Sequence, residues 1–383
     1  MSTATPSANR SLLILFSVIV LDLIGFGVVV PILPFYAKQY GASATVLGLL
    51  LTSYSAMQFA FSSLWGRLSD RIGRKKTLVL TIAGSAASLV LVGLANSLLL
   101  LFAGRILSGI FAANISVASA YVTDVTTEEN RSKGMGMIGA AFGIGFLLGP
   151  ALGGVLSHHG YHVPILTAAA LSALNFLYAL WRLPEPARHH KPSLSQDEVV
   201  ETRVLAQPQV FKLCAIYFLF TIAVNQLESI FAFFMMRRFS YDAMHVAYIL
   251  ALMALIMIVI QGGLIRTLTQ RYGETLLLLS GSLLLGASFA CVPLSPTVAL
   301  LLLPLGIASV GRGISQPSLL SIVSKKSSPQ MRGAVMGTFQ ASASLGRVIG
   351  PVIAGFLFDQ GMAFPFYLAG GLMAAVFLLS LNT

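Results

Sequence analysis

Between two long apolar runs the chain carries a short charged stretch, Gly66-Arg67-Leu68-Ser69-Asp70-Arg71-Ile72-Gly73-Arg74-Lys75-Lys76. It holds five cations and one acid within eleven residues. A chain can enter water for so few residues between two such runs only if both runs cross a bilayer. Short positive loops are retained on the cytoplasmic side of a membrane, so we place this loop in the cytoplasm.

The composition is that of a membrane protein. The chain has 383 residues, of which 56% are hydrophobic and only 10% charged, and its mean hydropathy is +0.84. The net charge of +11 could suit a nucleic-acid partner. However, most Lys and Arg residues fall in one alternate set of loops, whereas a nucleic-acid site gathers cations on one surface. We therefore expect a lipid bilayer around the chain and no nucleic acid.

Twelve apolar runs are long enough to span a bilayer, which takes about 20 residues at the helical rise. Both termini then lie in the cytoplasm. The expected spans are residues 11–34, 44–66, 77–95, 97–122, 134–157, 161–182, 209–236, 243–265, 275–294, 297–322, 332–357 and 362–381.

The two sets of six spans are related by an internal repeat. Six residues of the first set recur 201 positions later (131 and 332, for example): Arg131, Met135, Gly136, Gly149, Pro150 and Gly154. We expect an all-α membrane protein with six-helix bundles at 1–182 and 209–383, joined by a cytoplasmic linker at 183–208. A parallel repeat predicts a pseudo-twofold axis along the membrane normal and a cavity at the interface of the bundles.

Several motifs resemble those of the major facilitator superfamily, and within it the twelve-helix drug:proton antiporters that include tetracycline-efflux and multidrug exporters. The motifs are the loop Gly66–Lys75, Arg105 with Gly109, the glycine-rich run from Gly145 to Gly154, and the opening Leu21–Gly27 followed by Pro31–Pro34. The resemblance covers essentially the whole chain. It implies alternating access between two bundles.

Two acids lie inside predicted spans, Asp22 and Glu228. A carboxylate is costly in a membrane, so each should be buried in protein, paired or protonated. Burial favours the protonated form and a nearby cation the ionised form. We expect Asp22 to be the main proton-coupling acid, Arg105 to be its counter-ion, and Glu228 to be a substrate contact or second proton site. A static ion pair that locks two helices is the alternative for Asp22.

The charged loop is expected to act as a conformational latch. Its residues are Gly66, Asp70, Arg71, Gly73 and Arg74. The resemblance implies that the acid, Asp70, faces the amino end of the eleventh span, near Ser328 to Gly333, which carries partial positive charge. A loop that only fixes topology would explain the cations but not the acid.

The glycine-rich run places small residues on one side of the fifth span. Its residues are Gly145, Gly149, Pro150, Gly153 and Gly154. Small residues let membrane helices approach closely, and a proline bends a helix. We expect a tight, kinked seal between the halves, and plain helix packing is the alternative.

Seven polar residues within the spans are candidates for the cavity wall, although interhelical hydrogen bonds would also explain many of them. They are Tyr54, Gln58, Asn114, Asn225, Gln226, Gln261 and Arg347. Arg312 lies in the cytoplasmic half of its span, and extension of its side chain toward the membrane surface explains it better than a substrate contact.

We expect no enzyme activity, cofactor or metal. No nucleophile–base or nucleotide-binding Gly-Lys-Ser/Thr pattern is present, and the histidines at 158, 159 and 162 lack an accompanying acid or cysteine.

The expected function is proton-driven export of amphiphilic small molecules by a monomer in the cell inner (plasma) membrane. Proton-coupled uptake, and export or flipping of a sugar-like metabolite or glycolipid, are the alternatives. Tetracycline exporters carry acids in the third and ninth spans, whereas runs 77–95 and 275–294 have none. Tetracycline itself is therefore in doubt as the cargo.

Overall fold

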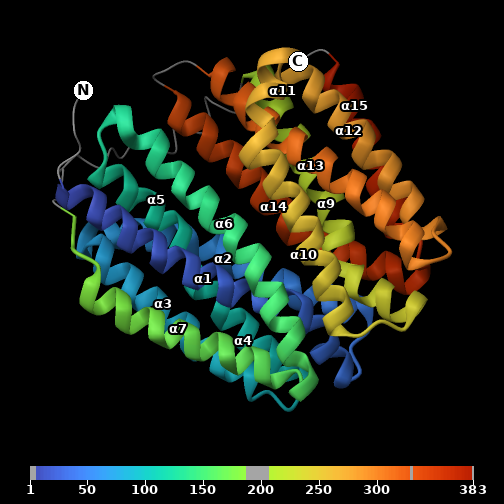
Figure 1. Cartoon of the computed structure of the whole chain (residues 1–383), viewed down its shortest axis with the longest axis horizontal. Coiled ribbons are helices and arrows are strands. Elements are labelled where there is room, and N and C mark those ends of the chain that lie inside the picture. Colours follow the sequence, from blue (N-terminus) through green and yellow to red (C-terminus); the bar gives the residue numbers. More distant parts are fainter. Residues whose placement is uncertain (1–5, 187–206, 328–330, 382–383) are drawn as a thin grey trace. The chain divides into compact units, whose positions relative to one another are not determined.

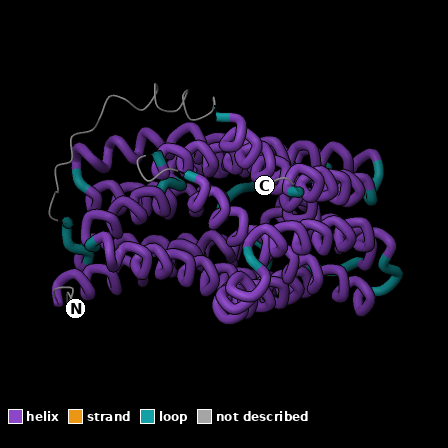
Figure 2. Tube along the Cα trace, turned by 90° about the horizontal axis from the view of Figure 1, so that it is seen from above, coloured by secondary structure: helices purple, strands orange, loops and turns teal. Residues whose placement is uncertain are grey.

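The computed structural model describes residues 6–186, 207–327 and 331–381. Within these ranges all regular structure is helical, as Figures 1 and 2 show. Eleven of the described helices are long and apolar enough to cross a membrane, and Phe364–Ser380 is a shorter apolar helix. The expected all-helical membrane fold is therefore confirmed, with eleven of the expected spans matched by such helices and the twelfth by the shorter one.

The chain divides into two compact units, and the boundaries between them run through two helices. In the described part of the chain, unit 1 comprises residues 6–42, 53–186 and 241–251. Unit 2 comprises residues 43–52, 207–240, 252–327 and 331–381. The predicted division at 182 and 209 stays a prediction, and most of the predicted linker, residues 187–206, lies outside the described residues.

The helices of the first half begin and end close to the expected spans. They are α1 (Pro6–Gln39), α2 (Ala44–Ile72), α3 (Arg74–Gly93), α4 (Leu98–Phe111), α5 (Asn114–Val125), α6 (Glu128–Leu156), the 3-10 turn η1 (Ser157–His159) and α7 (His162–Arg182).

The helices of the second half follow the same order. They are α9 (Pro208–Phe239), α10 (Ala243–Val259), the π-helical turn η2 (Ile260–Leu264), α11 (Ile265–Tyr272), α12 (Glu274–Cys291), the 3-10 turn η3 (Val292–Leu294), α13 (Val298–Lys326), α14 (Arg332–Gln360) and α15 (Phe364–Ser380).

Unit 1 is built around α1, which packs along α6 and α7, while α3 packs on α4 and α7. Aliphatic side chains such as Leu15 and Ile19 fill its core together with Tyr121. The Tyr121 hydroxyl donates to the carbonyl of Pro184 at 2.6 Å, so this buried polar atom is satisfied and the end of α7 is held in place.

Unit 2 has the corresponding arrangement, with α9 against α14 and α15 and with α12 against α13 and α15. Two aromatic contacts mark its core. The rings of Tyr217 and Phe339 are stacked with centroids 4.2 Å apart, and Phe234 meets Phe366 edge to face at 5.0 Å.

Two departures from the expected spans concern the helix backbone. The fourth span is broken between α4 and α5, at Ala112 and Ala113, although this segment has no proline. The eighth span contains the π-turn η2, which includes Gln261, Gly262 and Gly263. Such a turn inside an α-helix is often found at a functional site.

Candidate functional site

The break between α4 and α5 is held by side chains of α2. Trp65 donates its indole N–H to the carbonyl of Ile110, and Gln58 Nε2 donates to the carbonyl of Ala112 at 3.0 Å. A break frees backbone carbonyls that no water can reach in a bilayer, so a partner from a neighbouring helix is needed. Gln58, a predicted cavity residue, therefore supports the backbone of the broken span.

The break brings Asn114 to the first position of α5, where it faces Asp22 on α1. Asn114 Nδ2 donates to Asp22 Oδ1 at 2.7 Å. The amino end of α5 also carries partial positive charge, which favours a carboxylate nearby. The Oδ1 atom of Asn114 is buried without a hydrogen-bond partner. The structure thus joins the predicted coupling acid to a residue predicted for the cavity wall.

Arg105 is not the ion-pair partner of Asp22, which corrects the expected pairing. Its side chain is buried, and the guanidinium carbon lies 4.1 Å from the ring centroid of Tyr54. A cation over an aromatic face is stabilised by the ring quadrupole. The reason for the difference is geometric, because Arg105 on α4 points toward α2 whereas Asn114, beyond the break, reaches α1.

The second intramembrane acid has a cationic partner that the sequence did not reveal. Glu228 on α9 and Arg312 on α13 form an ion pair, and both side chains are partly exposed. We expected the Arg312 side chain to extend toward the membrane surface. In the structure it pairs instead with Glu228 within unit 2. The partners are 84 positions apart in the sequence, which explains why a linear pattern could not find the pair.

The remaining cavity candidates in unit 2 have different surroundings. Asn225 donates to the carbonyl of Thr221 on its own helix at 2.8 Å. Gln226 is fully buried and donates to the carbonyl of Gly350 on α14 at 3.2 Å, which places it in a helix interface. Arg347 is exposed and donates to Ser344 at 2.8 Å. Gln261 lies in the π-turn η2.

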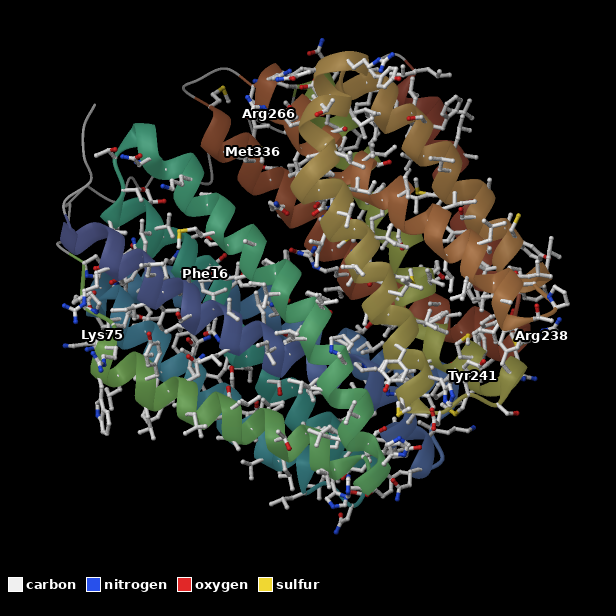
Figure 3. All side chains as sticks on the ribbon, in the orientation of Figure 1. Phe16, Lys75, Arg238, Tyr241, Arg266 and Met336 are labelled. Carbon is white, nitrogen blue, oxygen red and sulfur yellow. The ribbon has the colours of Figure 1, made fainter. Side chains whose placement is uncertain are left out.

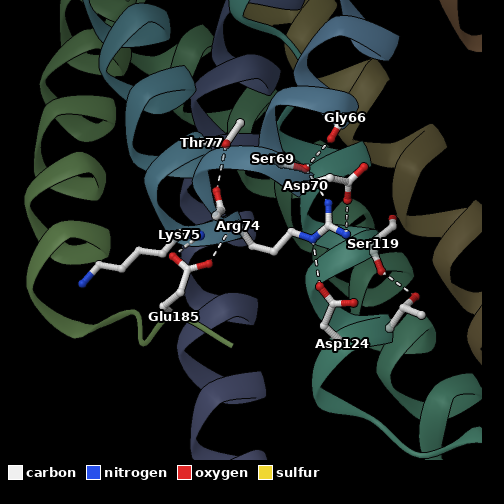
Figure 4. A network of polar contacts seen from close by, with 11 residues as sticks. Gly66, Ser69, Asp70, Arg74, Lys75, Thr77, Ser119, Asp124 and Glu185 are labelled. Carbon is white, nitrogen blue, oxygen red and sulfur yellow. Dashed lines mark hydrogen bonds and ion pairs between the residues drawn. The ribbon is translucent and has the colours of Figure 1, made fainter. Parts of the chain in front are cut away.

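The charged loop forms a compact network at the junction of α2 and α3 (Figure 4). Arg74 pairs with Asp70 at 2.6 Å and with Asp124, at the end of α5, at 2.8 Å. Figure 3 shows Lys75 projecting away from the helices at the same junction. The predicted latch residues are thus together, whereas the predicted contact of Asp70 with the start of the eleventh span stays a prediction.

Glu185 explains the glycine at position 73. Its carboxylate accepts the backbone N–H of Arg74 at 2.6 Å and caps α3. Gly73 has φ of 110°, and a Cβ there would come within 2.7 Å of the Glu185 carboxylate. Sequence reasoning missed both Glu185 and Asp124. Both are acids at helix ends near a cation-rich loop, and that pattern in the sequence could have pointed to them.

The glycine-rich run of α6 packs against the backbone of α1. A Cβ on Gly145 would lie 2.5 Å from Leu23 Cβ, one on Gly149 would lie 2.6 Å from Gly27 Cα, and one on Gly153 would lie 2.7 Å from Val28 O. Gly154 instead faces Ala247 at the start of α10, also in unit 1. The glycines therefore act in helix packing, whatever further role they have.

The repeated run on α14 makes matching contacts in unit 2. Gly350 faces Asn225 on α9, and Gly355 faces Ala44 at the start of α2. Asp359, at the end of α14, accepts the backbone N–H groups of Ala44 at 3.1 Å and Thr45 at 2.8 Å. A carboxylate at this place caps the amino end of α2.

The amino end of α10 is capped by Asp242, the residue directly before the helix. Asp242 accepts the backbone N–H of His245 at 3.0 Å and pairs with the His245 ring at 2.6 Å. Burial alone would raise the pKa of Asp242, but the backbone and ring hydrogen bonds from His245 outweigh it and hold this pKa below its usual 3.8. Among the described residues, no cluster of three metal-binding side chains is present.

Comparison with known proteins decides the family. The model of the Major Facilitator Superfamily matches residues 15–347 and 264–382. The chain belongs to this superfamily. It is therefore a multi-pass membrane transporter and not an enzyme.

Curated relatives align over nearly the whole chain. A class D tetracycline resistance protein from Salmonella ordonez is 30% identical over 92% of this chain and 90% of its own length. Multidrug resistance protein 2 from Bacillus subtilis (strain 168) is 29% identical over 94% of this chain and 92% of its own.

Solved structures share the fold. The human organic anion transporter MFSD10 (TETRAN) is 26% identical, covers 98% of this chain and 100% of its own, and superimposes with a TM-score of 0.76. A bacterial homologue of the human lysosomal transporter Spinster, 17% identical, covers 100% of this chain and 96% of its own at a TM-score of 0.77, which shows the common fold alone.

Proposed function

We propose that the chain is a proton-coupled exporter of amphiphilic small molecules that works by alternating access. The observation that carries this proposal is the carboxylate of Asp22 in the middle of α1, which has an amide partner in Asn114 and no cationic partner among the described residues. A carboxyl group with an amide partner can be protonated or ionised, whereas an ion pair with a cation would keep it ionised. Curated relatives named for tetracycline and multidrug resistance support export.

Asp22 binds a proton when it faces the side of higher proton concentration and releases it on the other side. The hydrogen bond from Asn114 stabilises the ionised form, and a change in that contact alters proton affinity. Glu228 has a different role, because Arg312 neutralises it within unit 2. We assign it to substrate contact or to a second proton site that opens when the pair separates.

Alternating access requires the two halves to rock, and the charged loop is the proposed latch for this motion. Arg74 holds Asp70 and Asp124 together at the cytoplasmic ends of α2 and α5. From the cation-rich loops we propose that both termini lie in the cytoplasm and that the protein resides in the cell inner (plasma) membrane. We further propose that a monomer performs the cycle.

The proposed cargo is an amphiphilic small molecule, and the sequence puts tetracycline itself in doubt. Tetracycline exporters carry acids in the third and ninth spans, whereas residues 77–95 and 275–294 here contain none. Aromatic rings one helical turn from Asp22 offer an apolar surface. The ring centroid of Phe26 lies 5.7 Å from that of Tyr54 and 6.0 Å from that of Phe146. Lipophilic drugs fit such a surface, and a glycolipid or sugar-like metabolite is the remaining candidate cargo.

The test is a ligand-stabilisation screen of the purified protein, followed by transport of each hit in everted vesicles. An exporter accumulates the ligand inside these vesicles when a proton gradient, acidic inside, is imposed. Accumulation only in right-side-out vesicles would show proton-coupled uptake instead. Binding without movement under either gradient would contradict a transport function for that ligand.

A further inference from the structure

Residues of α2 contact the broken fourth span from Arg105 on α4 to Ala112 in the break. Tyr54 lies against the Arg105 guanidinium, and Gly109 is so close to α2 that a Cβ there would lie 2.4 Å from the Tyr54 carbonyl. One helical turn further, Gln58 donates to the carbonyl of Ala112. Trp65 then donates to the carbonyl of Ile110. These contacts lie within unit 1 and end at Ala112, two residues before Asn114.

The repeat provides an internal comparison for the role of these donors. In this part of the repeat the offset is 200, as for Arg71 and Arg271, so the positions that match Gln58 and Trp65 hold Ile258 and Ile265, neither of which has a side-chain donor. The corresponding helix, α13, runs unbroken from Val298 to Lys326 although it contains two prolines. The break and its two donors thus occur in the same half. This agreement indicates that the donors stabilise the break.

The break in turn determines where Asn114 lies. Asn114 is the first residue of α5 and lies two residues after Ala112, whose carbonyl Gln58 binds, and its Nδ2 reaches Asp22 at 2.7 Å. In a continuous helix the carbonyl of Ile110 would accept the backbone N–H of Asn114. In the structure Ile110 accepts from Trp65 instead, so the position of Asn114 depends on α2.

We propose that Gln58 and Trp65 are positioning residues that set the proton affinity of Asp22 through Asn114. The inference rests on the proposed function for its consequence, which is that a shift of α2 along α4 changes proton binding. α2 is suited to this, because its first turns, residues 44–52, belong to unit 2 while Gln58 and Trp65 belong to unit 1. In the structure both side chains donate to backbone carbonyls of the broken span and not to Asp22.

The experiment is a pH titration of the Asp22 carboxyl group by infrared difference spectroscopy on the purified full-length protein. The band is assigned by its loss in Asp22→Asn. Because a carboxylate that loses a donor holds its proton more tightly, Gln58→Leu should move the midpoint upward by about one pH unit. Asn114→Leu should cause the same shift, and the double variant should show no further shift, since both changes remove one contact.

Two further variants separate positioning from folding. Trp65→Phe keeps the packing and should give a smaller shift in the same direction. Gln226→Leu removes a comparable amide-to-carbonyl bond, to Gly350 in unit 2, and should lower stability without moving the midpoint. The proposal is overturned if Asn114→Leu shifts the midpoint while Gln58→Leu and Trp65→Phe leave it unchanged. The titration needs no transport, so its result stands apart from the test of proton-coupled export.

Discussion

Gly149 of α6 and Gly27 of α1 form one of the closest backbone contacts in unit 1, since a Cβ on Gly149 would lie 2.6 Å from Gly27 Cα. Gly149→Ala should therefore force the helices apart and lower the free energy of unfolding by about 1–3 kcal/mol. Gly139→Ala is the matched control on the same helix, because nothing lies within 4 Å of its added Cβ. Thermal unfolding in detergent measures both, and equal stability of the two variants would contradict the contact.

The pairing of Glu228 with Arg312 predicts a favourable interaction in a double-mutant cycle. Glu228→Gln and Arg312→Gln should each destabilise unit 2, because each leaves a partly buried charge unpaired. The double variant should recover part of the loss, with a coupling free energy on the order of 1–3 kcal/mol. Simple additivity of the two effects would show that the side chains do not interact.

The latch network predicts different effects for its two acids. Asp70→Asn should abolish transport while the amount of protein in the membrane stays normal, because the proposed latch loses its acid. Asp124→Asn leaves Arg74 with Asp70 and should reduce transport only partly. Transport assays together with quantitative membrane fractions measure both. Normal transport by Asp70→Asn would leave the loop with a topological role only.

The cap at the start of α10 predicts a pH-dependent stability term. Since the pKa of Asp242 is below its ordinary 3.8, its contribution is present above that value and is lost as pH falls through the lower, folded-state pKa. The stability difference between wild type and Asp242→Asn should be on the order of 0.5 kcal/mol near neutral pH, because the His245 pair is half-exposed. It should shrink as the pH falls below 3.8 toward the lower, folded-state pKa, and a difference that grows on acidification would have the wrong sign.

The spans could be predicted from sequence because apolar length and charged loops report on the bilayer directly. The break at Ala112 could not, because it depends on donors from α2 and not on a proline. The partner of Asp22 was missed for the same reason, since the break decides whether Arg105 or Asn114 reaches α1. Glu228 and Arg312 were each noticed, but their pairing depends on the packing of α9 on α13.

The most direct test of the account is proton-driven transport by Asp22→Asn in proteoliposomes. Wild-type protein should accumulate cargo when a pH gradient is imposed and should move protons when a cargo gradient is imposed. Asp22→Asn should still bind cargo and exchange it at equilibrium, but both gradient-driven fluxes should be lost. Accumulation by Asp22→Asn at the wild-type level under the same pH gradient would contradict the central claim.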